Sequence, residues 1–147
     1  MAKLKLFYVA LFLLLFTANI ATAQDVVGKW WNQEKTSQVQ IYKSGEKYYG
    51  AIAWIKDPND EKGVPKTDIF NPRESERTKP LMRLVILRDF VKENDTFWSG
   101  GKIYDPRDGK TYSCNMTLKG NELDLRGFIG FSFIGKTNTW TRVGPGE

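Results

Sequence analysis

The chain has 147 residues, a formal net charge of +5, one cysteine and no histidine. One cysteine excludes an internal disulfide, and the absence of histidine excludes imidazole-based catalytic triads and the common zinc sites. The mild positive charge gives no case for a nucleic-acid-binding protein, whose surface would carry a concentrated basic patch.

The first 23 residues have the pattern of a secretory signal peptide. Lys3 and Lys5 precede an apolar run of 11 residues at 6–16, and an Ala-Thr-Ala sequence at 21–23 resembles a cleavage site. The run is shorter than the roughly 20 residues that a membrane helix needs. We therefore expect cleavage after position 23, which lowers the formal charge from +5 to +3 by removing both lysines. The expected product, residues 24–147, is a single periplasmic or secreted domain without a membrane span.

Short extended segments separated by turn residues fill the rest of the chain. Residues 38–42, 111–118 and 122–126 alternate in polarity, which is typical of strands with one buried face. No segment after the apolar run shows a sustained helical period. We predict an all-β fold, a small antiparallel up-and-down β-barrel of about eight strands. The predicted strands are residues 28–31, 38–42, 48–55, 84–90, 97–104, 111–118, 122–126 and 136–143.

The strand at 111–118 contains the single cysteine. Tyr112, Cys114, Met116 and Leu118 share one face of this strand, and small polar residues share the other. Because the apolar face of such a strand packs into the core, we interpret Cys114 as a small buried hydrophobic residue and not as a reactive thiol.

Residues 98–112 pose a choice between a phosphate-binding loop and a turn. The sequence Asp-Pro-Arg-Asp-Gly at 105–109 suits a type I turn, and a strand follows it where a phosphate-binding loop would require a helix. We therefore predict a hairpin that pairs Ile103 with Tyr112, both pointing inward. Gly100 and Gly101 lie within a predicted strand, where glycine marks a bulge, a sharp bend or a close backbone approach.

One connection, residues 56–80, is far longer than the two to five residues of most hairpin loops. Asn71 could cap a short helical turn at 73–78, while Ile69 and Phe70 could pin the segment to the barrel. Two interpretations stay open for this loop: a lid across one end of the barrel, or a solvated charged segment.

The acidic residues of this loop do not form a calcium-binding pattern. Asp57, Asn59, Glu61 and Asp68 lack the spacing of an EF-hand, because the glycine at 63 comes one position late. We predict no metal site and no cofactor.

The two ends of the barrel sequence contain a matching pair. A Gly-Lys-Trp sequence ends at Trp30, and a Thr-Trp-Thr-Arg sequence ends at Arg142. This resembles the lipocalin-type (calycin) arrangement, in which a tryptophan near the N-terminus packs under an arginine from the last strand. The resemblance implies that Trp30 and Arg142 close the barrel by stacking the guanidinium on the indole.

Further motifs resemble the secreted bacterial family called domain of unknown function 2147. They are GKWWNQEK, VQIY, YYGAIAWI, GGKIYDPRDGKTYS, LDLRG and TWTRV, together with Asp68 and the Asn71-Pro72 pair. The resemblance covers essentially the whole segment after the apolar run. It implies a periplasmic, Gram-negative setting and a lipocalin-like barrel, and it supplies no reaction. The chain departs from the family pattern at Lys79, where arginine is usual, and at Arg83, where glycine is usual.

The hypothesis that we favour is a barrel that binds a small apolar or amphipathic ligand. Its candidate ligand-binding residues are Trp54, Trp98 and Tyr104 from the strands and Asn71 and Arg77 from the long loop. The alternative is a non-catalytic interaction or structural protein of the cell envelope, in which these aromatic side chains fill the barrel.

An enzyme is the least favoured hypothesis. Asp105 and Asp108 are explained by the turn, and no nucleophile with an adjacent base is visible, so no catalytic residue is assigned. The sequence predicts neither the identity of a ligand nor the oligomeric state.

Overall fold

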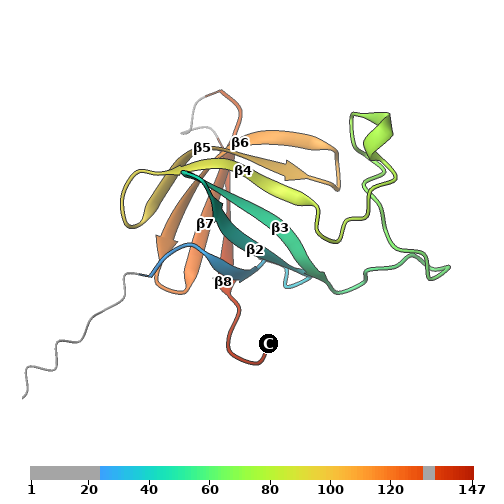
Figure 1. Cartoon of the computed structure of the whole chain (residues 1–147), viewed down its shortest axis with the longest axis horizontal. Coiled ribbons are helices and arrows are strands. Elements are labelled where there is room, and N and C mark those ends of the chain that lie inside the picture. Colours follow the sequence, from blue (N-terminus) through green and yellow to red (C-terminus); the bar gives the residue numbers. More distant parts are fainter. Residues whose placement is uncertain (1–23, 131–134) are drawn as a thin grey trace, which may run out of the picture.

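The computed structural model describes residues 24–130 and 135–147 (Figure 1). In this part of the chain, eight strands form a closed barrel in which each strand pairs antiparallel with the next and β8 pairs with β1. The all-β, up-and-down barrel predicted from the sequence is confirmed, whereas the predicted signal peptide lies outside the described residues. The strands are β1 (Gly28–Trp31), β2 (Ser37–Ser44), β3 (Lys47–Ile55), β4 (Val85–Lys92), β5 (Phe97–Asp105), β6 (Lys110–Lys119), β7 (Glu122–Phe128) and β8 (Gly135–Arg142).

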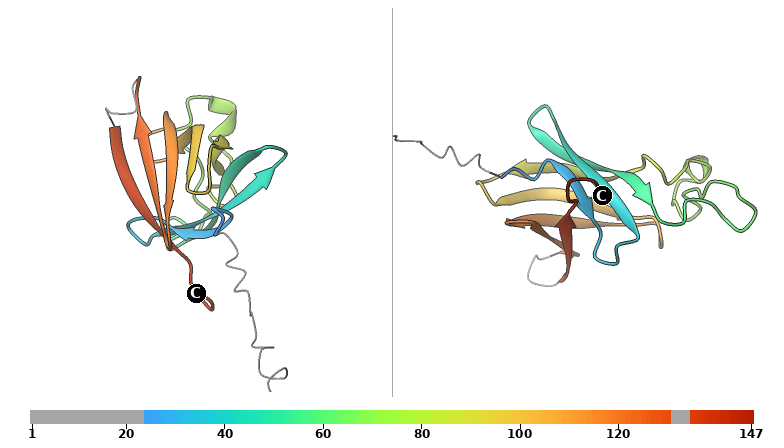
Figure 2. Two further views of the ribbon diagram at one scale, coloured as in Figure 1. Left: turned by 90° about the vertical axis from the view of Figure 1, so that its left-hand side faces the viewer. Right: turned by 90° about the horizontal axis from the view of Figure 1, so that it is seen from below.

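The barrel has two ends that differ in their connections. We call the end where β1, β3, β5 and β7 finish the barrel mouth, and the opposite end the barrel base. Figure 2 shows the connection between β3 and β4 extending from the mouth, on the far side of the barrel from the start of β1. At the base, the β2–β3 hairpin turns through Gly45 at φ 60°, a left-handed conformation that glycine adopts without strain.

The first and last strands meet at the base. Trp30 pairs with Arg142 across β1 and β8, and the guanidinium carbon of Arg142 lies 4.2 Å from the centroid of the Trp30 ring. The same guanidinium donates hydrogen bonds to the carbonyls of Asp25 (2.7 Å) and Val27 (3.3 Å). Trp30 is fully buried, and its indole N–H donates to the carbonyl of Val26 at 2.8 Å. The arginine therefore ties the segment before β1 to the end of β8.

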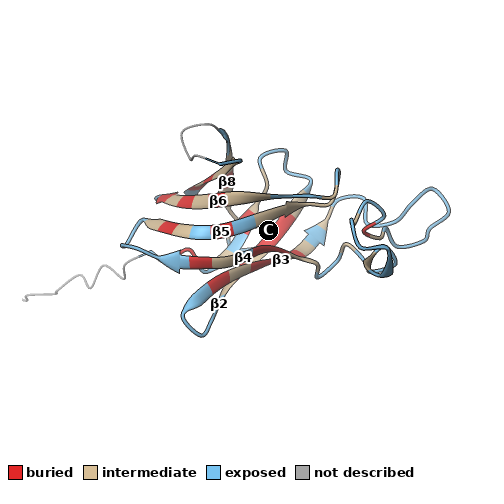
Figure 3. Ribbon diagram, turned by 90° about the horizontal axis from the view of Figure 1, so that it is seen from above, coloured by how far each residue is buried: buried red, intermediate tan, exposed pale blue. Residues whose placement is uncertain are grey.

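Aromatic side chains fill the barrel near its base. Trp30, Tyr48, Phe90 and Trp98 point inward and are buried, and the Trp98 ring meets the Tyr48 ring edge to face at 5.9 Å. Figure 3 shows buried positions alternating with mostly intermediate ones along strands such as β3 and β6, as expected when one face of each strand lines the core.

Gly101 is required by this packing. A Cβ atom at position 101 would lie 2.4 Å from the ring of Phe90, so no larger residue fits without displacing the ring. The pairing of β5 with β6 shifts register between Trp98 and Gly101, and Gly100 has φ 70°. Of the alternatives predicted for this strand the bulge is confirmed, and the group that comes close to Gly101 is the Phe90 side chain rather than a backbone segment. Beside it, Cys114 is buried as predicted, and its burial raises the pKa of the thiol to about 12.

The β3–β4 loop, residues 56–84, is folded upon itself. Isolated bridges join Asn59 to Pro65 and Thr67 to Pro80, and a 3-10 helix, η1 (Glu74–Glu76), forms near its tip. Arg83 has φ 68°, a conformation that glycine adopts more easily.

Two details predicted for this loop are wrong. Asn71 does not cap a helix: its side-chain oxygen accepts a hydrogen bond from the backbone N–H of Arg73, so the local turn precedes η1, which has no side-chain cap. The side chains of Ile69 and Phe70 do not pin the loop, because these residues are 60% and 56% exposed. The fully buried residue next to them is Asp68.

Candidate functional site

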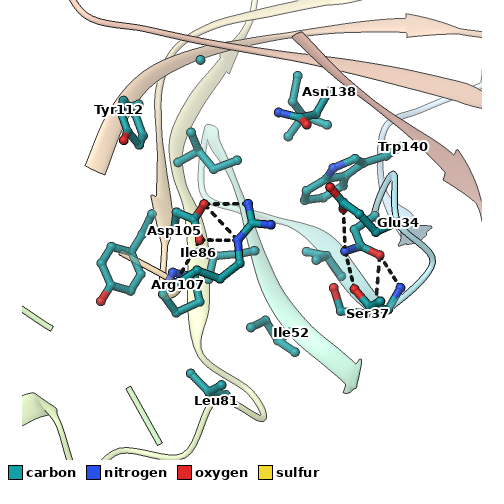
Figure 4. Close-up of a pocket in the computed structure, with 18 of the residues that line it drawn as sticks. Glu34, Ser37, Ile52, Leu81, Ile86, Asp105, Arg107, Tyr112, Asn138 and Trp140 are labelled. Atoms are coloured by element: carbon teal, nitrogen blue, oxygen red, sulfur yellow. Dashed lines mark hydrogen bonds and ion pairs between the residues drawn. The ribbon is translucent and has the colours of Figure 1, made fainter. Parts of the chain in front are cut away.

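The half of the barrel next to the mouth contains a cavity of about 760 Å³ that is open to solvent (Figure 4). The cavity is lined by the inward faces of the strands and by the four connections at the mouth, including Lys66 and Leu81 from the β3–β4 loop. It is hollow because its inward side chains are mostly aliphatic, with Gly127 on β7 adding no side chain, whereas aromatic rings occupy the same barrel near the base.

The floor of the cavity is apolar. Five buried side chains from five different strands form it: Val39, Ile52, Ile86, Leu125 and Trp140. Alternation along each strand dictates which residues face inward, and a floor of this kind removes apolar ligand surface from water. The four aliphatic side chains of the floor carry no hydrogen-bonding group.

The rim of the cavity is polar and charged. Arg107 binds Asp105 with two hydrogen bonds, from Nη2 to Oδ2 at 2.7 Å and from Nε to Oδ1 at 2.9 Å. This contact with the guanidinium lowers the pKa of the Asp105 carboxyl. The other charged side chains that line the cavity are Glu34, Lys56, Asp57, Lys66 and Lys136.

The β1–β2 connection is ordered by one side chain at the rim. The Asn32 side-chain oxygen accepts hydrogen bonds from the backbone N–H groups of Thr36 (2.8 Å) and Ser37 (3.0 Å), and its amide nitrogen donates to Glu34 at 3.1 Å. Figure 4 shows this set on the opposite side of the cavity from the Arg107–Asp105 pair. Polar side chains fixed by hydrogen bonds therefore lie on both sides of the mouth.

Tyr104 is the one candidate ligand-binding residue from the sequence that lines the cavity. Its hydroxyl donates a hydrogen bond to Asp68 Oδ1 at 2.7 Å. Burial, and then this bond to the carboxylate, raise the pKa of Tyr104. Asn71 also contacts Asp68, and Arg77 donates to the carbonyl of Asn71 at 2.8 Å, so these two loop residues lie behind the cavity wall.

The other two candidates lie elsewhere. Trp98 is fully buried near the base, at the opposite end of β5 from Tyr104. Trp54 is 40% exposed on the outside of the barrel, where its ring meets that of Trp31 edge to face at 5.4 Å. Its outward direction comes from a bulge: Trp54 pairs with Gln38 but Ile52 pairs with Val39, so Ala53 is an extra residue that reverses the alternation.

Most of the cavity residues were missed by sequence reasoning. Arg107 was interpreted only as part of a turn, and the aliphatic floor residues were treated as core. A usable signal was present, because alternate connections of an up-and-down barrel must lie at the same end. The turns at 32–36 and 105–109 could therefore have been assigned to one rim.

The described residues contain no group of three or more His, Cys, Asp or Glu side chains placed to hold a metal ion. In the same ranges, no helix is long and apolar enough to cross a membrane.

Comparisons with known proteins agree with the fold. The model of the family DUF2147, described as an uncharacterized protein conserved in bacteria, matches residues 28–142. A solved structure of protein HP1028 from Helicobacter pylori, described as belonging to the lipocalin family, is similar with a TM-score of 0.73. The two chains are 27% identical, over 82% of this chain and 84% of that one. No curated protein matches the sequence.

Proposed function

We propose that this chain, which belongs to the bacterial family DUF2147 and forms a lipocalin-like barrel, binds a small amphipathic ligand at its mouth. The apolar part of the ligand lies on the apolar floor of the cavity, and its polar part lies among the charged side chains of the rim. Tyr104 forms part of the wall that the ligand contacts. The protein acts as a carrier or a receptor for this ligand and catalyses no reaction on it.

The observation that carries this proposal is the cavity itself. Its volume of about 760 Å³ lies within the range of roughly 300–1,000 Å³ found for small-molecule sites. Side chains in a filled barrel would take up this space, because protein interiors are close-packed. The alternative of a filled barrel accounts for the base, where aromatic rings meet. It does not account for the cavity in the half of the barrel next to the mouth.

We further propose that the protein acts in the periplasm. The support is the charged start, apolar centre and small-residue cleavage pattern of residues 1–23. Native mass spectrometry of protein purified from its own periplasmic fraction tests both proposals, because the mass reports cleavage before Gln24 and any retained small molecule.

A matched pair of variants tests ligand binding. Ile103 lines the cavity on β5, whereas Val91 is 40% exposed on β4 near the base. Ile103→Trp places an indole in the cavity and should weaken the affinity for the fluorescent amphiphile dansyl undecanoic acid at least about tenfold, whereas Val91→Trp should leave it unchanged. Melting midpoints of both variants report whether the barrel is intact. The proposal fails if the unmodified protein causes no fluorescence gain, or if both variants bind the probe as it does.

A further inference from the structure

A buried carboxylate holds the β3–β4 loop against the barrel. Asp68 has an exposed fraction of 0%, and its two oxygens accept separate hydrogen bonds: Oδ1 from the Tyr104 hydroxyl and Oδ2 from the Asn71 side-chain nitrogen, each at 2.7 Å. We call these three residues the loop anchor. Tyr104 belongs to β5, so the anchor joins the loop to a strand 36 positions away in the sequence.

Stability alone is a poor explanation for this arrangement. Both donors are neutral, and within residues 24–130 and 135–147 Asp68 takes part in no ion pair. Removing a carboxylate from water costs free energy that neutral hydrogen bonds only partly offset, and an apolar contact would hold a loop at lower cost. The carboxylate fixes the orientation of the loop relative to β5, because its two hydrogen-bond donors must approach it from defined directions.

The anchor lies next to the residues that the loop contributes to the cavity. The backbone N–H of Asp68 donates to the carbonyl of Lys79 at 2.9 Å, and that of Leu81 donates to the carbonyl of Lys66 at 3.0 Å. Lys66 and Leu81 both line the cavity. A short two-stranded arm therefore runs from the anchor to the cavity wall, and its position follows that of Asp68.

A second contact fixes the same part of the loop. The carbonyl oxygen of Phe70 lies so close to Gly109, in the β5–β6 hairpin, that an added Cβ atom there would be 1.9 Å from it. Figure 1 shows this part of the loop, with η1, beside the end of the β5–β6 hairpin. The loop is thus pressed backbone to backbone against the hairpin that carries Tyr104 and Arg107.

From this geometry we propose that Asp68 is a positioning residue for ligand retention. Through Tyr104 and Asn71 it holds the β3–β4 loop as a wall of the cavity, so that a bound amphiphile leaves slowly. The inference rests on the proposed function. Tyr104 has two roles in it: the residue borders the cavity, and its hydroxyl, whose pKa is raised by burial and by the bond to Asp68, donates to that carboxylate.

The chain contains a matched control for the Tyr104 hydroxyl. Tyr112 also lines the cavity and also donates to an aspartate, but its partner is Asp108, in its own hairpin, at 3.2 Å. Tyr104→Phe removes the bond to the loop and Tyr112→Phe removes the bond within the hairpin. Each variant loses one hydroxyl that donates to an aspartate, so a difference between them in the exchange of the loop reports the anchor.

Hydrogen exchange without ligand tests the positioning. In Tyr104→Phe the backbone N–H groups of Asp68 and Leu81 should exchange roughly 10- to 100-fold faster, as expected when a hydrogen bond to a charged group is lost. In Tyr112→Phe their exchange should equal that of the unmodified protein. Unchanged exchange of these two groups in Tyr104→Phe overturns the proposal.

Stopped-flow release of dansyl undecanoic acid tests retention. Tyr104→Phe should release the probe about tenfold faster or more. The control for release is Tyr49→Phe, which removes a bond to Asp89 (3.3 Å) away from the cavity lining and should change the rate less than about twofold. A loosened loop with an unchanged release rate would refute the retention role. If the unmodified protein binds no probe, the proposed function fails, and with it retention, while the exchange measurement still decides whether Asp68 positions the loop.

Discussion

The contact between Phe70 and Gly109 can be measured as a difference between two glycine substitutions. Gly109 has φ 71° and Gly120 has φ 60°, so both residues occupy the left-handed region at hairpins next to β6. An added Cβ atom meets the Phe70 carbonyl oxygen at position 109 and nothing within 4 Å at position 120. The two alanine variants therefore share the backbone strain and differ in the contact with the β3–β4 loop.

The expected magnitudes follow from these terms. A left-handed conformation costs alanine about 1–2 kcal/mol, and the lower entropy of its unfolded chain returns about 0.4–1 kcal/mol. Gly120→Ala should therefore lower the free energy of unfolding by about 1 kcal/mol. Gly109→Ala carries the same strain and also moves the Phe70 carbonyl by more than about 1 Å, since real Cβ contacts do not fall below 3.0 Å. Loss of a hydrogen bond to the neighbouring Asp68 carboxylate adds about 1.5–3 kcal/mol.

Equilibrium unfolding in urea measures both free energies for a barrel that unfolds in one transition. We expect Gly109→Ala to be less stable than Gly120→Ala by about 1.5–3 kcal/mol, the term assigned above to the Asp68 hydrogen bond. A difference below about 0.5 kcal/mol is the scatter of ordinary surface substitutions and would refute the reasoning. The loop would then move away from position 109 without losing the hydrogen bond to Asp68.

Two further predictions concern the base and the core. Arg142→Ala should lower the free energy of unfolding by about 2–3 kcal/mol, because it removes the contact with the Trp30 ring and two hydrogen bonds. Alanine at the exposed Arg88 should change the same free energy by less than about 0.5 kcal/mol. Equal melting midpoints of the two variants would reject the role of Arg142 in closing the barrel. Iodoacetamide should modify Cys114 slowly in the folded protein and rapidly in urea, since burial both shields the thiol and raises its pKa to about 12; equal rates would contradict the buried assignment.

The fold could be predicted from the sequence because its determinants are local. Alternation in segments such as 111–118 assigns each side chain to a face, and turn residues mark where strands end. The Asp-Pro-Arg-Asp-Gly turn gave the register of the β5–β6 hairpin, in which Ile103 pairs with Tyr112 and both line the cavity. Gly101 was informative for the same reason, since a glycine inside a strand needs a neighbour that comes close.

The cavity could not be predicted in the same way, because it depends on side-chain volume summed across strands. Trp98 and Tyr104 are both aromatic residues of β5, yet Trp98 packs among rings at the base while Tyr104 borders the cavity. Trp54 occupies a position that strict alternation assigns to the interior, and one bulged residue, Ala53, turns it outward. Neither outcome is visible until all eight strands are placed.

The β3–β4 loop shows most clearly where local reasoning ends. Its apolar residues, Ile69 and Phe70, were the obvious candidates for contact with the barrel, yet both side chains are exposed and the buried one is Asp68. A carboxylate becomes an interior residue only when donors from elsewhere reach it, and the Tyr104 hydroxyl comes from a different strand. A loop held by apolar contact alone could slide over the hairpin at little cost, because apolar contact is not directional. Attachment through a buried carboxylate is directional, so it fixes the wall of the cavity as well as the loop.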